Sequence, residues 1–503
     1  MLNTSEDKRS AALDDLVRGF PYVNGALFAE GLPLAAFTRA MREHLLDACA
    51  IDWSGITPAI FGALFQSIMD DKARRNLGAH YTSEENILKL VKPLFLDELR
   101  AEFERIKGNR NRPFEFHKKL RALTFLDPAC GCGNFLVITY RELRLLELDV
   151  LRAAYQDGQQ VVNTHLRLAV DVDQFHGIEI EEFPAQIAQV ALWLIDHQMN
   201  VLAGEEFGLY FARIPLKATP HIVHGNALRL DWNEVLPAQR CSYVLGNPPF
   251  VGSKLLGESQ RADADAAFGR LAGAGLLDFV AAWYVKTTRY MKNVQDGVAP
   301  RAAFVSTSSI TQGEQEVLLW GWLLAQGVHI RSAHRTFKWS NEARGMAAVH
   351  CVIVGFGLEE PASKTLFEYE NIRGEPHAFA VARINPYLVD APDVLAVGRL
   401  IPLCPVPPIL NGSIPADGGN LLLDAAERDR LLALEPQAAA FIRPYVGAED
   451  FIHGLVRYCL WLVGCPPDLL RQMPNVRMRI GFVREMREKS AKAATRAKAA
   501  TPT

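Results

Sequence analysis

The chain has 503 residues, of which 49% are hydrophobic and 22% charged, and its formal net charge at pH 7 is −3. This composition is typical of a globular protein with sizeable cores, and the length predicts about three domains. No apolar run reaches the ~18 residues of a membrane span, and the first residues lack the apolar segment of a signal peptide. Eight cysteines without regular spacing predict reduced thiols inside the cell. Membrane proteins and disulfide-rich secreted domains are therefore excluded.

The chain divides into three regions by the rhythm of its apolar residues. Residues 1–75 show helical periodicity. Residues 76–360 alternate strands with helices, which predicts an α/β fold with a doubly wound sheet. The helical rhythm fades in residues 361–503, where a proline-rich linker at 402–415 precedes renewed aromatic and apolar order.

A glycine turn follows a short apolar strand at Leu123 to Leu126. The turn, Asp127 to Phe135, has the sequence DPACGCGNF and leads into a helix. Its glycines allow a tight turn and a close approach of a ligand to the backbone. Strand, glycine turn and helix form the context of nucleoside sites, although the G-x-G-x-x-G spacing of a phosphate cradle is absent. Cys130 and Cys132 are interpreted as small turn residues, and no metal site is predicted.

A carboxylate ends the next strand. Phe175 to Ile180 is an apolar strand with Glu179 at its end, and a helical pattern follows from Pro184 to Gln198. A carboxylate in this place is the usual partner of ribose hydroxyls. Glu181 and Glu182 are expected to face solvent at the start of the helix, which leaves Glu179 as the candidate ligand.

Asn247 to Phe250, with the sequence NPPF, is the most informative stretch of the chain. It follows an apolar strand that ends at Gly246. Neither proline has an N–H group and both fix φ, so the segment holds an amide oxygen and a proline carbonyl rigidly beside an aromatic ring. Two acceptors and a stacking face suit a planar ring that carries an exocyclic amine. A plain turn after a strand is the alternative.

Together these motifs resemble the class I, S-adenosylmethionine-dependent amino-methyltransferases of DNA. The glycine turn is similar to their cofactor motif, and NPPF is similar to their catalytic motif. Leu77 to Ser83 resembles the motif that caps the methionine end of the cofactor, and its position before the glycine turn matches the order typical of N6-adenine enzymes. His221 to Leu228 resembles the third cofactor strand. Asn226 there departs from the family's usual Asp, although an Asn still accepts a hydrogen bond.

The resemblance implies specific site residues. Those expected to bind S-adenosylmethionine are His80, Tyr81, Thr82, Asp127, Pro128, Ala129, Gly131, Gly133, Asn134, Phe135, Glu179, Ile180, Asn226 and Ala227. Those expected to act in catalysis are Asn247, Pro248, Pro249 and Phe250. Phe250 and Phe337 are expected to stack on the target base. Trp339 is a second candidate for the role of Phe337, and core packing is the alternative for Phe337 and Trp339.

Four further segments carry a closer likeness: Gly78 to Glu98, Thr307 to Gly313, Phe337 to Val354 and Phe451 to Leu462. With them the chain resembles the methyltransferase portion of type IIG (IIL) restriction–modification enzymes. This resemblance implies a helical spacer at 1–75, a Rossmann-like methyltransferase domain at 76–360, and a linker with a partial target-recognition domain at 361–503. It also implies a site-specific, adenine-specific DNA-methyltransferase that flips its base out of duplex DNA. No nuclease region is expected ahead of the first motif. Such a protein is expected in the bacterial cytoplasm, bound to DNA, with a separate chain for recognition or cleavage left open as a partner.

Charge is unevenly distributed along the chain. Residues 471–503 contain nine basic and two acidic residues, which predicts either a phosphate-binding strip or a solvated face. A second basic segment at 107–121 is expected to form a solvated loop. Three other readings of the whole chain remain: methylation of glutamine in a protein or of RNA, a catalytically silent DNA-binding fragment, and a restriction nuclease.

Overall fold

The structure is a computed structural model, and it describes most of the chain. The described residues are 10, 14, 36–51, 60, 82–109, 111–154, 168–207, 220–339, 349–399, 401–407 and 416–501. The chain forms two compact units, Met1–Gly398 and Arg399–Thr503. Most of the predicted helical region at 1–75 lies outside the described residues, and within it helix α2 spans Arg39–Ala50.

The first unit is built on a mixed sheet, in which the described residues form nine strands in the order β3-β2-β1-β4-β5-β7-β6-β8-β9. The parallel part comprises β1 (Phe125–Asp127), β2 (Phe175–Glu179), β3 (His221–His224), β4 (Tyr243–Gly246) and β5 (Arg301–Thr307). The remaining strands are β6 (His329–Trp339), β7 (Val349–Gly357), β8 (Lys364–Glu368) and β9 (His377–Val381). The order reverses between β1 and β4, which makes this the switch point of the sheet.

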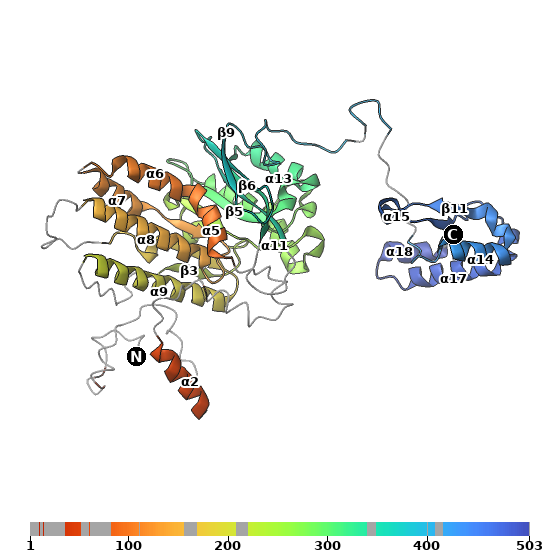
Figure 1. The fold of residues 1–503 in the computed structure, drawn as a ribbon, viewed down its shortest axis with the longest axis horizontal. Coiled ribbons are helices and arrows are strands. Elements are labelled where there is room, and N and C mark those ends of the chain that lie inside the picture. The colour runs from red at the N-terminus through yellow and green to blue at the C-terminus, as the bar shows by residue number, and fades with distance from the viewer. Residues whose placement is uncertain are drawn as a thin grey trace. The chain divides into compact units, whose positions relative to one another are not determined.

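Helices cover both faces of the sheet, as Figure 1 shows. One face carries α5 (Glu84–Val91), the π-helical turn η3 (Lys92–Leu96), α6 (Asp97–Ile106), α7 (Arg112–Ala122), α8 (Asn134–Ala154) and α9 (Glu182–Phe207). The other carries α10 (Trp232–Val235), α11 (Glu258–Phe268), α12 (Ala281–Met291) and α13 (Gly313–Ala325). The predicted doubly wound α/β sheet is therefore confirmed.

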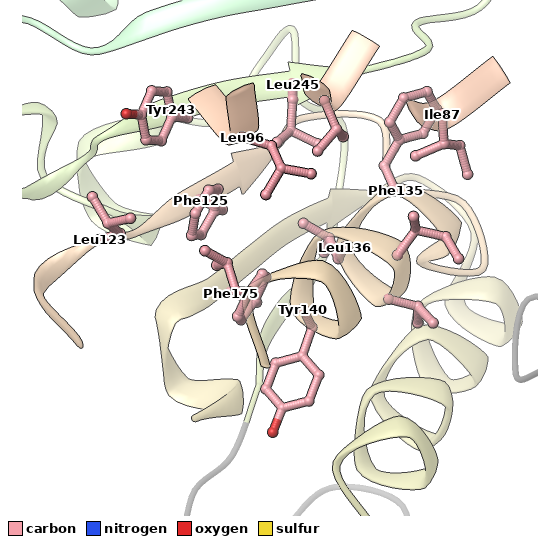
Figure 2. Close-up of a cluster of buried hydrophobic side chains, with 14 of the residues drawn as sticks. Ile87, Leu96, Leu123, Phe125, Phe135, Leu136, Tyr140, Phe175, Tyr243 and Leu245 are labelled. Atoms are coloured by element: carbon pink, nitrogen blue, oxygen red, sulfur yellow. The ribbon is translucent and has the colours of Figure 1, made fainter. Parts of the chain in front are cut away.

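Two hydrophobic cores lie on the two faces of the sheet because successive strand residues point in opposite directions. Phe125 belongs to the core beneath α8, and its neighbour Leu126 belongs to the core beneath α12. Figure 2 shows the first of these cores, where the Phe125 ring stacks on Phe175 with a centroid distance of 5.0 Å. The Tyr243 ring stacks on the same Phe125 at 5.6 Å, so aromatic contacts join β1, β2 and β4.

The second unit has its own small sheet and core. Its strands are β10 (Leu422–Leu423), β11 (Ile442–Tyr445) and β12 (Arg457–Leu460), and its helices are α14 (Ala425–Leu434), α15 (Ala448–His453), α16 (Pro467–Arg471), α17 (Pro474–Glu488) and α18 (Ala493–Ala497). The expected loss of helical order is therefore wrong here. Val476, Ile480 and Val483 line one buried side of α17, a pattern that its many arginines obscure in the sequence.

The basic segments have structural partners. Residues 112–122 form helix α7 rather than the predicted loop, because Phe116 and Leu120 give it a buried face one turn apart. In the C-terminal strip, Arg487 donates hydrogen bonds to the carbonyls of Ala416, Lys498 and Thr501, which stabilises the unit itself.

Arg477 and Arg484 of the same strip remain exposed.

Among the described residues, no helix is long and apolar enough to cross a membrane.

Candidate active site

The predicted motifs meet at one edge of the sheet. The parallel strands β1, β2 and β4 end at Asp127, Glu179 and Gly246, and Asn247 follows directly. Asn226 lies two residues beyond the end of β3, whose last residue pairs with Glu179. The carboxyl ends of these strands flank the switch point, which is where open α/β sheets bind their ligands.

The glycine turn requires left-handed backbone at two positions. Gly131 has φ 54° and Gly133 has φ 85°, a region that L side chains rarely adopt. A Cβ atom on Gly133 would also lie 3.0 Å from the Cβ of Ala188, so the turn packs directly against α9. The backbone conformation therefore favours glycine at both positions, and the close approach to α9 requires it at Gly133.

Glu179 ties the turn to the end of β2. Its Oε2 accepts a hydrogen bond from the Gly131 N–H at 2.8 Å, and its Oε1 accepts one from the Glu181 N–H at 3.0 Å. Burial raises the pKa of Glu179, and these backbone donors act in the opposite direction. Glu181 and Glu182 are exposed, as predicted. A carboxylate is thus held at the strand end beside the glycine turn.

Asp127 is fully buried at the end of β1. Its Oδ1 accepts a hydrogen bond from the Ala129 N–H at 3.0 Å, whereas its Oδ2 has no partner in the described part of the chain. A Cβ atom on Gly246 would lie 2.5 Å from Oδ1, so only glycine there leaves room for the carboxyl group. Burial, with a further contribution from the negative charge of Glu179, raises the pKa of Asp127 to about 8.

The raised pKa of Asp127 predicts a pH dependence of stability. An unfolded Asp titrates near pH ~3.9, so between about pH 4 and 8 the folded state holds the extra proton. The free energy of unfolding should therefore fall as the pH rises through this window. In Asp127→Asn this part of the slope should disappear, as urea unfolding of the cofactor-free chain would measure. Equal slopes in the two proteins would refute the buried, protonated state.

Asn226 is held by a carboxylate that the sequence did not point to. Its Nδ2 donates to Oδ2 of Asp263 at 2.8 Å, and its Oδ1 accepts from the Leu228 N–H at 2.9 Å. Asp263 belongs to α11, is 5% exposed and also accepts a hydrogen bond from Nε of Arg229 at 2.6 Å. A carboxylate is thus present beside position 226, supplied by Asp263 and bonded to the Asn226 amide.

The amide of Asn247 has one engaged end and one free end. Its Nδ2 donates to Oγ1 of Thr82 at 3.2 Å, and Thr82 is 3% exposed. Its Oδ1 is buried and has no hydrogen-bond partner among the residues that the structure describes. Burying an acceptor without a partner costs free energy, so its presence at a ligand-binding edge points to a group that it binds in function.

The loop after Asn247 is anchored to neighbouring elements. Pro248 is buried, and Phe250 is partly buried where the two cores meet. The Phe279 N–H donates to the carbonyl of Val251 at 2.9 Å, and Oδ1 of Asp278 accepts from the Ser253 N–H at 2.9 Å. The Asp278 carboxylate also accepts hydrogen bonds from Ser309 and Gln315, so it joins this loop to the end of β5 and the start of α13.

Phe337 lies in the core. Its side chain is 2% exposed, its ring stacks on Tyr369 at 5.2 Å, and Nζ of Lys89 lies 5.6 Å from its centroid. In this arrangement the ring offers no exposed face to a base, so the stacking role stays a prediction that requires the side chain to move. The side chain of Trp339 lies outside the described residues.

The remaining predicted residues surround the same edge. The carbonyl of Pro128 accepts a hydrogen bond from Nε1 of Trp283 at 3.1 Å, and the carbonyl of Ala227 accepts one from Nε1 of Trp232 at 2.9 Å. Ala129, Asn134, Phe135 and Ile180 flank the turn and the end of β2, and Oδ1 of Asn134 is buried without a partner among the described residues. His80 and Tyr81 lie outside the described residues.

Sequence reasoning missed Asp263, Asp278 and Trp283. Each contacts a motif, or for Asp278 the loop after one, from a helix or loop more than 20 residues away along the chain, and none belongs to a local pattern of its own. Cys130 and Cys132 fit the interpretation as turn residues, since burial raises the pKa of Cys132 to about 12 and that of Cys130 well above its ordinary value.

Comparisons with known proteins agree with this geometry. Residues 103–368, more than half of the chain, match the family described as MmeI, DNA-methyltransferase domain. Residues 390–503 match the family described as MmeI, target recognition domain.

Two similar proteins cover nearly the whole chain. The type IIL restriction–modification enzyme MmeI, solved in complex with DNA, is 57% identical with a TM-score of 0.88, and the match covers 100% of this chain and 66% of that one. DNA methyltransferase A of Bacillus subtilis (strain 168) is 36% identical over 492 residues, or 97% of this chain and 54% of the relative. The chain thus spans about half the length of that curated relative. The chain belongs to the MmeI family of DNA methyltransferases.

Proposed function

We propose that the chain transfers a methyl group from S-adenosylmethionine to the N6 amine of adenine in duplex DNA. The observation that carries the proposal is the Asn247 amide, whose buried Oδ1 has no partner in the described part of the chain and lies at the end of β4. A lone acceptor held in this way suits an amine hydrogen. The family match and the DNA-bound relative support DNA as the substrate.

The site residues fit the cofactor. The Glu179 carboxylate, fixed by backbone donors, suits the ribose hydroxyls, and the glycine turn leaves room for close approach. The buried Oδ2 of Asp127 has no partner among the described residues, and the positive charge of a bound ammonium or sulfonium group would favour loss of the Asp127 proton. Asn226 and Ala227 lie where the adenine ring would bind. When bound, S-adenosylmethionine supplies an electrophilic methyl group, and the protein supplies position and charge.

The catalytic segment would act on the amine of the target base. The lone pair of the amine nitrogen is delocalised into the base ring, so this nitrogen is a weak nucleophile. Oδ1 of Asn247 and the carbonyl of Pro248 would accept hydrogen bonds from the two amine hydrogens and draw the nitrogen toward tetrahedral geometry, which frees the lone pair for in-line attack on the methyl group. The N–C bond would form as the methyl–sulfur bond breaks and leaves a neutral thioether, and the methylated nitrogen would then lose one proton to water. Phe250 would stack on the base. A base inside duplex DNA cannot reach this edge, so it must flip out.

The proposal extends to the organisation of the protein. The methyltransferase domain predicted at 76–360 would extend to Val381, because β8 and β9 belong to its sheet. Residues 382–503 would form the linker and target-recognition part, and residues 1–75 a helical spacer. Double-stranded DNA is the proposed partner and the bacterial cytoplasm the proposed location. A separate chain for recognition or cleavage is compatible with this organisation.

The test is methyl transfer from tritium-labelled cofactor to duplex DNA, followed by chromatography of the nucleosides. Label in N6-methyladenine is the expected result. Label in cytosine, in RNA or in glutamine of a protein substrate would overturn the choice of adenine in DNA. Binding of the cofactor without transfer to any of these substrates would favour a catalytically silent protein.

A further inference from the structure

Thr82 and Asn247 are joined across 165 positions of sequence by a single side-chain contact. Thr82 directly precedes the N-cap of α5, and Asn247 directly follows β4. The Asn247 Nδ2 donates to Oγ1 of Thr82 at 3.2 Å, and only 3% of Thr82 is exposed. The sequence predicts a cofactor contact for Thr82, and the structure places its hydroxyl against the amide of the catalytic segment.

The contact bears on which end of the amide faces the substrate. An amide has an acceptor oxygen and a donor nitrogen of nearly the same shape, and methyl transfer requires the oxygen to face the amine. With Nδ2 bonded to Thr82, Oδ1 is the end left buried and free. In the reverse orientation the NH2 group would face an arriving amine, so two donors would oppose each other.

A hydroxyl donates as well as accepts, so Thr82 alone does not dictate the orientation. In the structure the Thr82 hydroxyl accepts from Nδ2, and this bond leaves Oδ1 as the end available to the substrate. Removing the hydroxyl would leave both ends of the amide without a partner, and the two orientations would become similar in free energy. Part of the population would then present a donor to the base.

We propose that Thr82 is a positioning residue that orients the Asn247 amide so that Oδ1 faces the target amine. The inference rests on the proposed methyl transfer, but it adds a residue from the segment before α5 to the chemical step. It predicts that Thr82 acts on the rate of transfer more than on the affinity for cofactor. A direct contact with the cofactor alone predicts the opposite pattern.

The experiment compares Thr82→Val, which keeps the shape and removes the hydroxyl, with Thr82→Ser, which keeps the hydroxyl. Single-turnover transfer to duplex DNA and calorimetric titration of S-adenosylmethionine are measured on the full chain. We expect Thr82→Val to slow transfer about two- to tenfold, from the smaller population of the productive orientation and the loss of one hydrogen bond, with cofactor affinity within about twofold of wild type. Thr82→Ser should restore most of the rate.

The matched control is Thr287→Val, which removes a fully buried hydroxyl of α12 that has no partner in the described part of the chain. It should leave the transfer rate unchanged. A wild-type rate in Thr82→Val, or a loss confined to cofactor affinity, would overturn the positioning role while the proposed function stands. If wild-type protein transfers no methyl group to adenine, the proposed function fails and this inference with it.

Discussion

Asn247→Ala is expected to slow methyl transfer by about 100-fold or more while cofactor affinity stays close to that of the wild type. The reason is the position of the amide. Its Oδ1 makes no hydrogen bond with the described residues and does not belong to the glycine turn or to the end of β2. Its interaction with the amine strengthens as the nitrogen becomes tetrahedral, so the loss belongs to the chemical step.

The measurement is tritium transfer under single-turnover conditions, beside calorimetric titration of the cofactor. Asn293→Ala is the matched control, because Asn293 is exposed after α12 and lies in neither the glycine turn nor the catalytic segment. It should behave as wild type. If Asn247→Ala retained wild-type transfer, the catalytic assignment of the NPPF segment would be wrong.

The sheet edge could be read from the sequence because each of its motifs is local. Asp127, Glu179 and Asn247 each stand at the end of a short apolar strand, and parallel strands bring such ends together without further information. The conformation of the glycine turn was also predictable, since positive φ at Gly131 and Gly133 favours glycine. Most residues of the site could therefore be predicted, because they lie at strand ends and in a turn.

Contacts between distant segments could not be read in this way. The bond from Asn247 to Thr82 and the bond from Asn226 to Asp263 join elements whose approach depends on helix packing. Phe337 shows the same limit, because its aromatic ring is as compatible with stacking on Tyr369 as with stacking on a base. A side chain's type gives its chemistry, but only packing decides its partner.

Helices α17 and α7 were not predicted from the sequence for a different reason. Helix α17 carries Val476, Ile480 and Val483 on its buried side, but four arginines and two glutamates lie among them. The charge of this segment predicted a phosphate-binding strip or a solvated face, because only three residues mark the buried side of the helix. Helix α7 was hidden in the same way, with Phe116 and Leu120 among lysines and arginines. Short amphipathic faces become clear only when their partners are known.

The carboxyl edge holds several polar atoms in a state that folding alone does not favour. Oδ2 of Asp127, Oδ1 of Asn134 and Oδ1 of Asn247 are all buried without partners among the described residues. Each costs free energy unless a ligand or water satisfies it. Their convergence on the glycine turn and the catalytic segment is what a preorganised site requires, since polar groups are in place before the ligand arrives.

Glu179→Ala is expected to weaken binding of S-adenosylmethionine by about 10- to 150-fold, the loss of one charge-assisted hydrogen bond of about 1.5–3 kcal/mol. The structure adds a second cause. The carboxylate accepts the Gly131 N–H at 2.8 Å, so its removal also frees the glycine turn that would receive the cofactor. Both effects act on binding, and calorimetric titration measures their sum.

Two comparisons sharpen this prediction. Glu182→Ala is the matched control, because Glu182 is exposed at the start of α9 and its carboxylate contacts Gln186, so affinity should not change. In the wild type, burial raises the pKa of Glu179, so the carboxylate gains a proton earlier than usual as the pH falls. A protonated group loses part of its capacity to accept the ribose hydroxyls, so affinity should weaken toward acidic pH. Unchanged affinity in Glu179→Ala would remove Glu179 from the cofactor site, since neither the ribose contact nor the support of Gly131 would then matter for binding.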